Sequence, residues 1–225
     1  MDMSSRMCGA CEGFPDSHFC TLKQLNLEQI NNQKTLLSFK KGEVLFHEGD
    51  MPKGLYCLSS GVVRLNHHDT NGKEVLLRVH KRGDILGYRA LFAEEPYHAT
   101  AIAHETTEVC FIPFYVIKSI MCTDPNLSFS FLKQLSKELH SVEDRMSAVI
   151  SKPVHSRVAE ALIYFKEELP DSKWTRRDIA EWTGTTPETV MRTLAQFELE
   201  GLIRQEGRNI HISKTPELLK IAHNT

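Results

Sequence analysis

The apolar residues change from a helical spacing to a period of two near residue 38, and return to a helical spacing near residue 125. Between these points the apolar residues form short runs with a period of two, and seven of the 12 glycines fall among them. Short strands separated by glycine turns are typical of a small all-β roll or barrel. The expected strands are 44–46, 55–58, 62–65, 75–79 and 109–112, with Asn71-Gly72 as the hairpin turn between the third and the fourth.

Helical spacing is expected on both sides of this β region. Leucines and Ile30 predict a short helix near residues 22–30, and a long helix is expected after Pro125. Its apolar residues repeat at intervals of three and four over nearly three heptads, which favours the seam of a parallel homodimer; the alternative is a helix packed on its own domain. The seam residues are Leu132, Leu135, Leu139, Val142, Met146 and Val149. In this register Glu138 would face Glu143 of a second copy, and Pro153 interrupts the pattern, which places a hinge there.

The C-terminal part is predicted to be helix, turn, helix. Thr175 with Asp178 forms a capping-box start, and Thr186 followed by Pro187 forms a second helix start. Gly184 lies between them, where a tight turn is needed. Because the residues after 202 predict a short β-hairpin around 206–208, we expect a winged helix-turn-helix, a DNA-binding unit.

These patterns predict an α+β chain in four parts. They are a cysteine-rich arm over 1–28, a β-roll over 29–118, a dimerisation helix over 119–152 and a winged helix-turn-helix over 153–225.

Charge and composition exclude several classes of protein. Lys and Arg number 27 against 29 Asp and Glu, a net charge of -2, so no global positive field attracts nucleic acid and such a partner must be bound locally. No apolar run approaches the ~20 residues of a membrane-spanning helix. Residues 1–10 lack the apolar core of a secretory signal, so we expect a cytoplasmic protein. Phosphate-binding glycine loops and common hydrolase motifs are absent from the sequence, so we do not expect an enzyme.

The six cysteines are the main candidates for chemistry. In a reducing compartment they are expected to be thiols or metal ligands rather than disulfides. Cys8, Cys11 and Cys20 lie in a stretch with too little apolar surface to fold by itself, so a bound group is needed to order it. C-x2-C is also half of a common zinc site, and His18 could complete one. Cys57 and Cys122 are expected to be small hydrophobic residues.

Several motifs occur in a characteristic order. They are Lys41-Gly42-Glu43-Val44-Leu45-Phe46, Glu48-Gly49-Asp50, Gly54-Leu55-Tyr56, Ser60-Gly61, Arg82-Gly83-Asp84-Ile85-Leu86-Gly87 and Thr186-Pro187-Glu188-Thr189-Val190-Met191-Arg192. From about residue 35 to 213 the chain resembles the CRP/FNR family of bacterial transcription regulators. The resemblance implies a cyclic-nucleotide-binding-like jelly roll as sensor domain, a dimer, double-stranded DNA with inverted-repeat half-sites, and RNA polymerase as a partner.

Within that family the resemblance separates two kinds of ligand. The cyclic-AMP branch holds the phosphate with a glutamate after the glycine that matches Gly87 and with an Arg-Ser pair further on. Here those places hold Tyr88, and Tyr97 with His98. A cyclic nucleotide, or another small ligand in the β-roll, therefore stays as the alternative, because Arg89 lies one residue away.

The cysteines resemble the FNR branch instead. There, three N-terminal cysteines and one in the strand segment that matches Glu108–Phe114 hold an oxygen-labile [4Fe-4S] cluster. The resemblance implies Cys8, Cys11, Cys20 and Cys110 as its ligands here, for control by oxygen or another redox signal. The interval between Cys11 and Cys20 is longer than in FNR relatives, so zinc or thiol redox chemistry is the alternative.

The helix-turn-helix also resembles the family's DNA-reading helix. The implied DNA-binding residues are Thr186, Glu188, Thr189, Met191 and Arg192. Glutamate would accept from cytosine and arginine would read guanine. An ordinary surface ion pair between Glu188 and Arg192 is the alternative. Met191 stands where FNR relatives often have serine, so the outer bases of the half-site stay open.

Overall fold

The computed structural model describes residues 7–11, 13–15, 17, 19–70, 72, 74–207 and 209–223. The chain divides into two compact units. The first comprises Met1–Lys73 and Leu77–Lys137, and the second comprises Glu74–Leu76 and Glu138–Thr225. Each unit is described by itself below.

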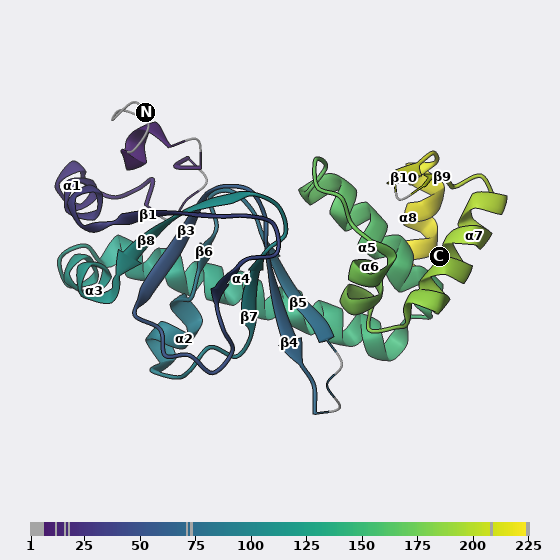
Figure 1. Cartoon of the computed structure of the whole chain (residues 1–225), viewed down its shortest axis with the longest axis horizontal. Coiled ribbons are helices and arrows are strands. Elements are labelled where there is room, and N and C mark those ends of the chain that lie inside the picture. The colour runs from purple at the N-terminus through teal and green to yellow at the C-terminus, as the bar shows by residue number, and fades with distance from the viewer. Residues whose placement is uncertain are drawn as a thin grey trace. The chain divides into compact units, whose positions relative to one another are not determined.

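The first unit is built on two four-stranded sheets that form the expected β-roll (Figure 1). One sheet has the order β1-β8-β3-β6 and the other β2-β7-β4-β5. Their bounds are β1 Thr35–Phe39, β2 Val44–Phe46, β3 Gly54–Ser60, β4 Val63–His68, β5 Glu74–His80, β6 Ile85–Leu86, β7 Thr100–Ala103 and β8 Thr107–Pro113. The α+β jelly-roll prediction is confirmed. All five predicted strands are present, and the predicted hairpin strands are neighbours, although Asn71 lies outside the described residues.

The β-roll buries its core between the sheets and under three helices. Leu58, Val63 and Val109 are fully buried in one apolar cluster. A second cluster joins the roll to α1 (Gln24–Gln33), α2 (Tyr88–Ala93) and α3 (Phe114–Thr123), and it includes Ile30 and Ile117. A short 3-10 turn, η2 (Cys8–Ala10), precedes α1. The strand β7 and the helices α2 and α3 were not predicted.

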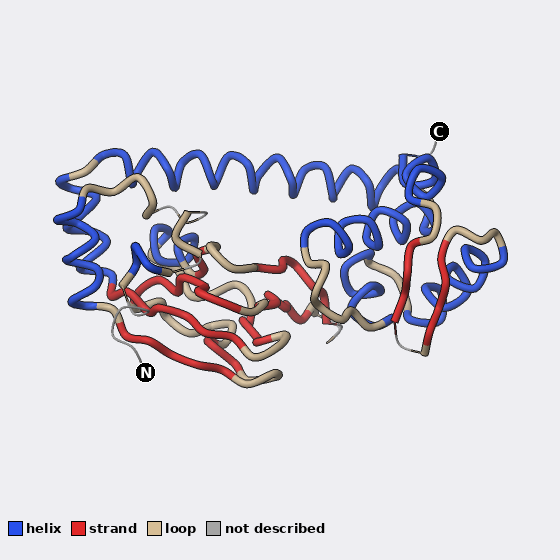
Figure 2. The backbone as a smooth tube through the Cα atoms, turned by 90° about the horizontal axis from the view of Figure 1, so that it is seen from above, coloured by secondary structure: helices blue, strands red, loops and turns tan. Residues whose placement is uncertain are grey.

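The long helix α4 covers Pro125–Ser151 and is continuous along its length (Figure 2). It begins at the proline from which the sequence predicts it. Pro153 forms the N-cap of the next helix, so the predicted break is confirmed. Residues 119–123, which the domain prediction assigned to the dimerisation helix, belong to α3.

The C-terminal unit contains the predicted winged helix-turn-helix. Its elements are α5 Val154–Glu168, α6 Arg176–Thr183, α7 Pro187–Leu199, β9 Ile203–Glu206, β10 Asn209–Ile212 and α8 Thr215–His223. The strands β9 and β10 pair as an antiparallel hairpin, which is the predicted wing. Arg208 of the predicted turn lies outside the described residues. Val158, Val190, Leu194 and Leu218 are fully buried in this unit.

Within the described residues, none of the helices combines the length and the apolar character needed to cross a membrane.

Candidate functional site

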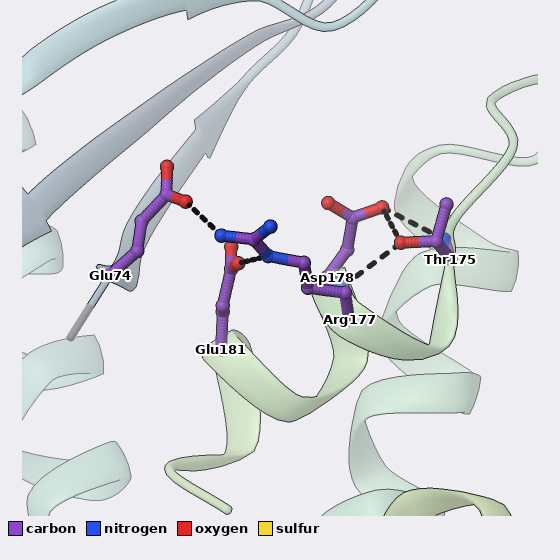
Figure 3. A network of polar contacts seen from close by, with 5 residues as sticks. All are labelled: Glu74, Thr175, Arg177, Asp178 and Glu181. Atoms are coloured by element: carbon purple, nitrogen blue, oxygen red, sulfur yellow. Dashed lines mark hydrogen bonds and ion pairs between the residues drawn. The ribbon is translucent and has the colours of Figure 1, made fainter. Parts of the chain in front are cut away.

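Two local devices fix the first helix of the helix-turn-helix. Thr175 Oγ1 accepts from Asp178 N–H at 3.2 Å, and Asp178 Oδ2 accepts from Thr175 N–H at 2.8 Å, which is the predicted capping box (Figure 3). Gly184 ends the helix with a φ of 67°, a conformation that a side chain would strain. The sequence therefore sets both ends of α6, and with them the turn before α7.

Arg177 on α6 is held by two carboxylates (Figure 3). Its Nε lies 2.8 Å from Glu181 Oε1, and its Nη2 lies 2.9 Å from Glu74 Oε2, a residue of the same compact unit. The hydrogen bond and charge of Glu181, followed by the charge of Glu74, raise the pKa of Arg177. Because its charge is balanced in this way, we do not count Arg177 among the candidate DNA contacts.

The second helix, α7, presents the predicted DNA-reading residues on its free face. Thr186 caps it by accepting from Thr189 N–H at 3.3 Å, and Pro187 occupies the first turn. Val190, Leu194 and Phe197 are buried beneath the helix. The exposed residues are Thr186, Glu188, Met191 and Arg192, and Thr189 is half-buried.

Glu188 and Arg192, the two charged residues of α7 among the predicted DNA contacts, have separate hydrogen-bond partners. Arg192 Nη2 donates to Thr189 Oγ1 at 3.4 Å. The backbone N–H of Glu188 itself and then the Thr186 hydroxyl hold the pKa of Glu188 below its usual range, and the charge of Arg192 adds to this. Glu188 is therefore ionised near neutral pH and able to accept a hydrogen bond from a base, as the direct-readout interpretation requires.

The predicted seam along α4 is largely uncovered in a single chain. Leu139 is 60% exposed and Met146 63%, and Leu132, Val142 and Val149 are also exposed. Leu135 differs because it packs against the apolar core of the first unit. Glu138 is buried within one chain, and its apposition to Glu143 of a second copy stays a prediction.

Four of the six cysteines, Cys8, Cys11, Cys57 and Cys110, lie near one another beside the sheet that contains β3 and β8. Cys57 on β3 and Cys110 on β8 are direct partners across two antiparallel strands. Cys8 is buried in the apolar cluster against which Cys57 packs. Lys34, at the end of α1, donates from Nζ to Cys8 Sγ at 3.1 Å.

Electrostatic effects among the thiols show the same grouping. Burial raises the pKa of Cys110 to about 11; the Lys34 ammonium opposes this, and Cys8 and Cys11 add to it. The pKa of Cys57 is also raised, first by burial and then by Cys110, Cys11 and Cys8. Two arm cysteines therefore lie near both strand cysteines.

The predicted ligand Cys20 is placed differently. Its side chain is exposed. Cys122 is exposed as well, so the expectation that it is a buried hydrophobic residue is wrong. The position of Cys57 opposite Cys110 was not predicted, because a single cysteine in a strand gives no signal of the strand opposite it.

A ready-made site for a single metal ion is not found among the described residues, since no three His, Cys, Asp or Glu side chains there are arranged to hold one. His18, the candidate fourth zinc ligand, lies outside the described residues. A four-iron cluster takes its four thiolates on separate irons, so its ligands lie farther apart than those of one ion. The chemistry of a loose group of thiols beside a lysine fits such a cluster.

Aromatic rings occupy the place in the β-roll where the cyclic-AMP branch holds its phosphate. Tyr97 is buried, and its ring stacks on Phe46 with centroids 3.7 Å apart. Its hydroxyl lies 3.3 Å from where a Cβ on Gly87 would stand. Tyr88, in the place of the glutamate, is also buried. Neither of these two tyrosines supplies a cation for a phosphodiester.

Comparisons with known proteins agree with this architecture. Residues 36–124 match the model of the cyclic nucleotide-binding domain, and residues 156–221 match that of the Crp-like helix-turn-helix domain. The fumarate and nitrate reduction regulatory protein of Escherichia coli K12 is 29% identical over 230 residues, covering 96% of this chain and 91% of that protein. The corresponding Klebsiella oxytoca protein is 29% identical, covering 94% and 90%.

Solved structures show the same fold. A crp/fnr-family transcriptional regulator of Eubacterium rectale superposes with a TM-score of 0.76 at 21% identity, covering 91% of this chain and 97% of that one. The c-di-GMP-responsive regulator CLP of Xanthomonas campestris superposes with a TM-score of 0.75 at 19% identity, covering 84% and 99%.

Proposed function

We propose, on the premise that this chain belongs to the CRP/FNR family of DNA-binding transcription regulators, that an iron–sulfur cluster sensitive to oxygen or another oxidant controls its DNA binding. The observation that carries the proposal is that Cys8 of the arm is buried in the apolar cluster on which Cys57 packs, and that Cys57 lies directly opposite Cys110 of β8. The charges of Cys8 and Cys11 both act on Cys110. Segments about 100 residues apart thus bring thiols to one place, as the FNR resemblance implies. When bound, the cluster supplies an oxidant-labile link between arm and β-roll.

The chain's own residues give the site two of the properties that such a group needs. The thiols of Cys8 and Cys110 are buried, which limits their contact with water and oxidants. Lys34 places a positive charge beside Cys8, and its charge reaches Cys57 and Cys110 as well. A cation near several thiolates offsets their mutual repulsion.

The DNA-binding half of the proposal rests on α7. Glu188 and Arg192 are exposed four residues apart on the face opposite the buried Val190 and Leu194. From Pro153 onward the chain has 10 Lys and Arg against 11 Asp and Glu, so general attraction to phosphates is weak. Binding should therefore depend on base contacts and on two linked copies of the helix.

The uncovered seam of α4 supports a homodimer. A stripe of exposed apolar side chains on a long helix is costly in water and is relieved by a second copy. A two-fold dimer presents two α7 helices, which calls for inverted-repeat half-sites about one helical turn apart. We place this regulator in the cytoplasm, with RNA polymerase as the family's partner, and assign it no enzymatic activity.

The test is anaerobic purification with iron, sulfide and zinc measured per chain, followed by DNA binding before and after exposure to air. We expect a brown protein with iron and sulfide that binds an inverted-repeat DNA and loses both the colour and the binding in air. Zinc without sulfide would favour the zinc alternative. A colourless protein whose DNA binding needs an added nucleotide would favour a ligand in the β-roll.

A further inference from the structure

Cys57 and Cys110 lie opposite each other at the centre of one sheet. The strands β3 and β8 run antiparallel, and this pair is in direct register, with Tyr56 opposite Phe111 on one side and Leu58 opposite Val109 on the other. Directly opposed residues point to the same face of a sheet, with Cβ atoms roughly 5 Å apart. Any group that reaches the thiol of Cys110 therefore also meets that of Cys57.

The arm comes to this same place. Cys8 is buried in the apolar cluster on which Cys57 packs, and its backbone N–H donates to Asn31 Oδ1 at 2.8 Å. Lys34, three residues after Asn31, donates from Nζ to the Cys8 sulfur. Cys8 is thus fixed at two points beside the strand cysteines, and Cys11 follows it by three residues.

Cys20 stands apart from this group. Its side chain is exposed, while the side chain of its neighbour Phe19 is buried in the same apolar cluster as Cys8. The Cys20 thiol thus lies on the outside of the arm, whereas Cys8 and Cys110 are buried. Cys57 is already held opposite Cys110 by the pairing of β3 with β8.

We propose that Cys57 takes the place of Cys20, so that Cys8, Cys11, Cys57 and Cys110 are the four thiolate ligands of the iron–sulfur cluster. This inference rests on the proposed function and specifies its site. It also accounts for the long interval between Cys11 and Cys20, since the third arm cysteine is then not required to reach the cluster.

The test compares single variants purified without oxygen. Iron and sulfide per chain and the visible absorption of the iron–thiolate bonds are measured for wild type, Cys57→Ser, Cys57→Ala, Cys20→Ser and Cys122→Ser. We expect both Cys57 variants to lose most of the iron, sulfide and absorption, while Cys20→Ser and Cys122→Ser keep the wild-type values. Far-UV circular dichroism and the unfolding midpoint establish that the Cys57 variants are folded. The alanine variant is included because it puts no polar atom in place of the buried thiol.

A labelling experiment avoids the need for variants. Iron-loaded and iron-free wild-type protein are treated with iodoacetamide under nitrogen and analysed by mass spectrometry. We expect Cys20 and Cys122 to be alkylated in both forms, and Cys11 to be protected only in the loaded form. Protection of Cys20 by iron, loss of iron in Cys20→Ser, or full iron in folded Cys57→Ala would each overturn the inference while leaving the cluster in place. Wild type without iron and sulfide would instead overturn the proposed function.

Discussion

The Nζ atom of Lys34 lies 3.1 Å from the Sγ atom of Cys8, where α1 gives way to β1. This contact ties the arm to the β-roll through a cation and a thiol. Substitution Lys34→Met removes the charge while keeping most of the side-chain volume. Groups that support a metal ligand typically contribute 10- to 100-fold to affinity or activity, so we expect iron to be lost in air about tenfold faster.

Two variants make that measurement specific. Lys34→Arg keeps the positive charge and should retain most of the wild-type lifetime of the iron. Lys23→Met changes an exposed lysine at the other end of the same helix and should have no effect. The loss of iron is measured as the fall of visible absorption in air. Equal rates for Lys34→Met and wild type would show that Lys34 does not support the site.

Arg192 is expected to read a guanine in each half-site. Arg192→Ala should weaken binding to a selected inverted repeat by about 1–3 kcal/mol per half-site and relax the preference at one base pair. Arg204→Ala, on the exposed wing, is the control and should weaken binding equally across sequences. Unchanged binding by Arg192→Ala, together with loss of binding on changing Met191 alone, would mean that α7 enters the groove differently.

The seam on α4 predicts the oligomeric state. Leu139→Glu places a charge in the centre of the exposed apolar stripe, and we expect sedimentation to show a folded monomer under conditions in which the wild type is a dimer. Lys137→Glu introduces the same side chain on the outer side of the heptad and should leave the dimer intact. If Leu139→Glu stays dimeric, the seam lies elsewhere.

The pair Asp84 and His80 predicts how stability changes in acid. Burial disfavours the charged form of Asp84, but the hydrogen bond and charge of His80, with the Lys81 backbone N–H, hold the pKa of Asp84 below its usual range. The folded state then binds fewer protons than the unfolded state, so the stabilisation is complete above about pH 4 and is lost as pH falls through the lower, folded pKa.

We therefore expect Asp84→Asn to lower the free energy of unfolding by about 1 kcal/mol at pH 7 and to reduce its fall between neutral and acidic pH. Urea unfolding of the iron-free protein at several pH values measures both effects. Asp171→Asn changes an exposed aspartate of the C-terminal unit and serves as the comparison. Identical pH slopes for wild type and Asp84→Asn would contradict the expectation.

Local signals were enough for the helix-turn-helix and for the long helix α4, although not for α2 and α3. The caps at Thr175 and Thr186, the turn at Gly184 and the break at Pro153 each act within a few residues, so their effect can be predicted without knowing what packs against them. The heptad of α4 is similarly a property of one segment. The strand β7 is short and two of its four residues are alanines, which are not enriched in strands, so its pairing with β2 and β4 defines it.

The sequence by itself determined the architecture, the capped DNA-reading helix and the three thiols Cys8, Cys11 and Cys110 as candidates for one site. Only the tertiary structure decided that Cys57 lies opposite Cys110 and that Cys20 is exposed. The physical reason is strand register: residues 57 and 110 meet because β3 pairs with β8, and that pairing depends on burial across both sheets rather than on residues near either cysteine. Contacts between distant strands leave no local pattern in the chain.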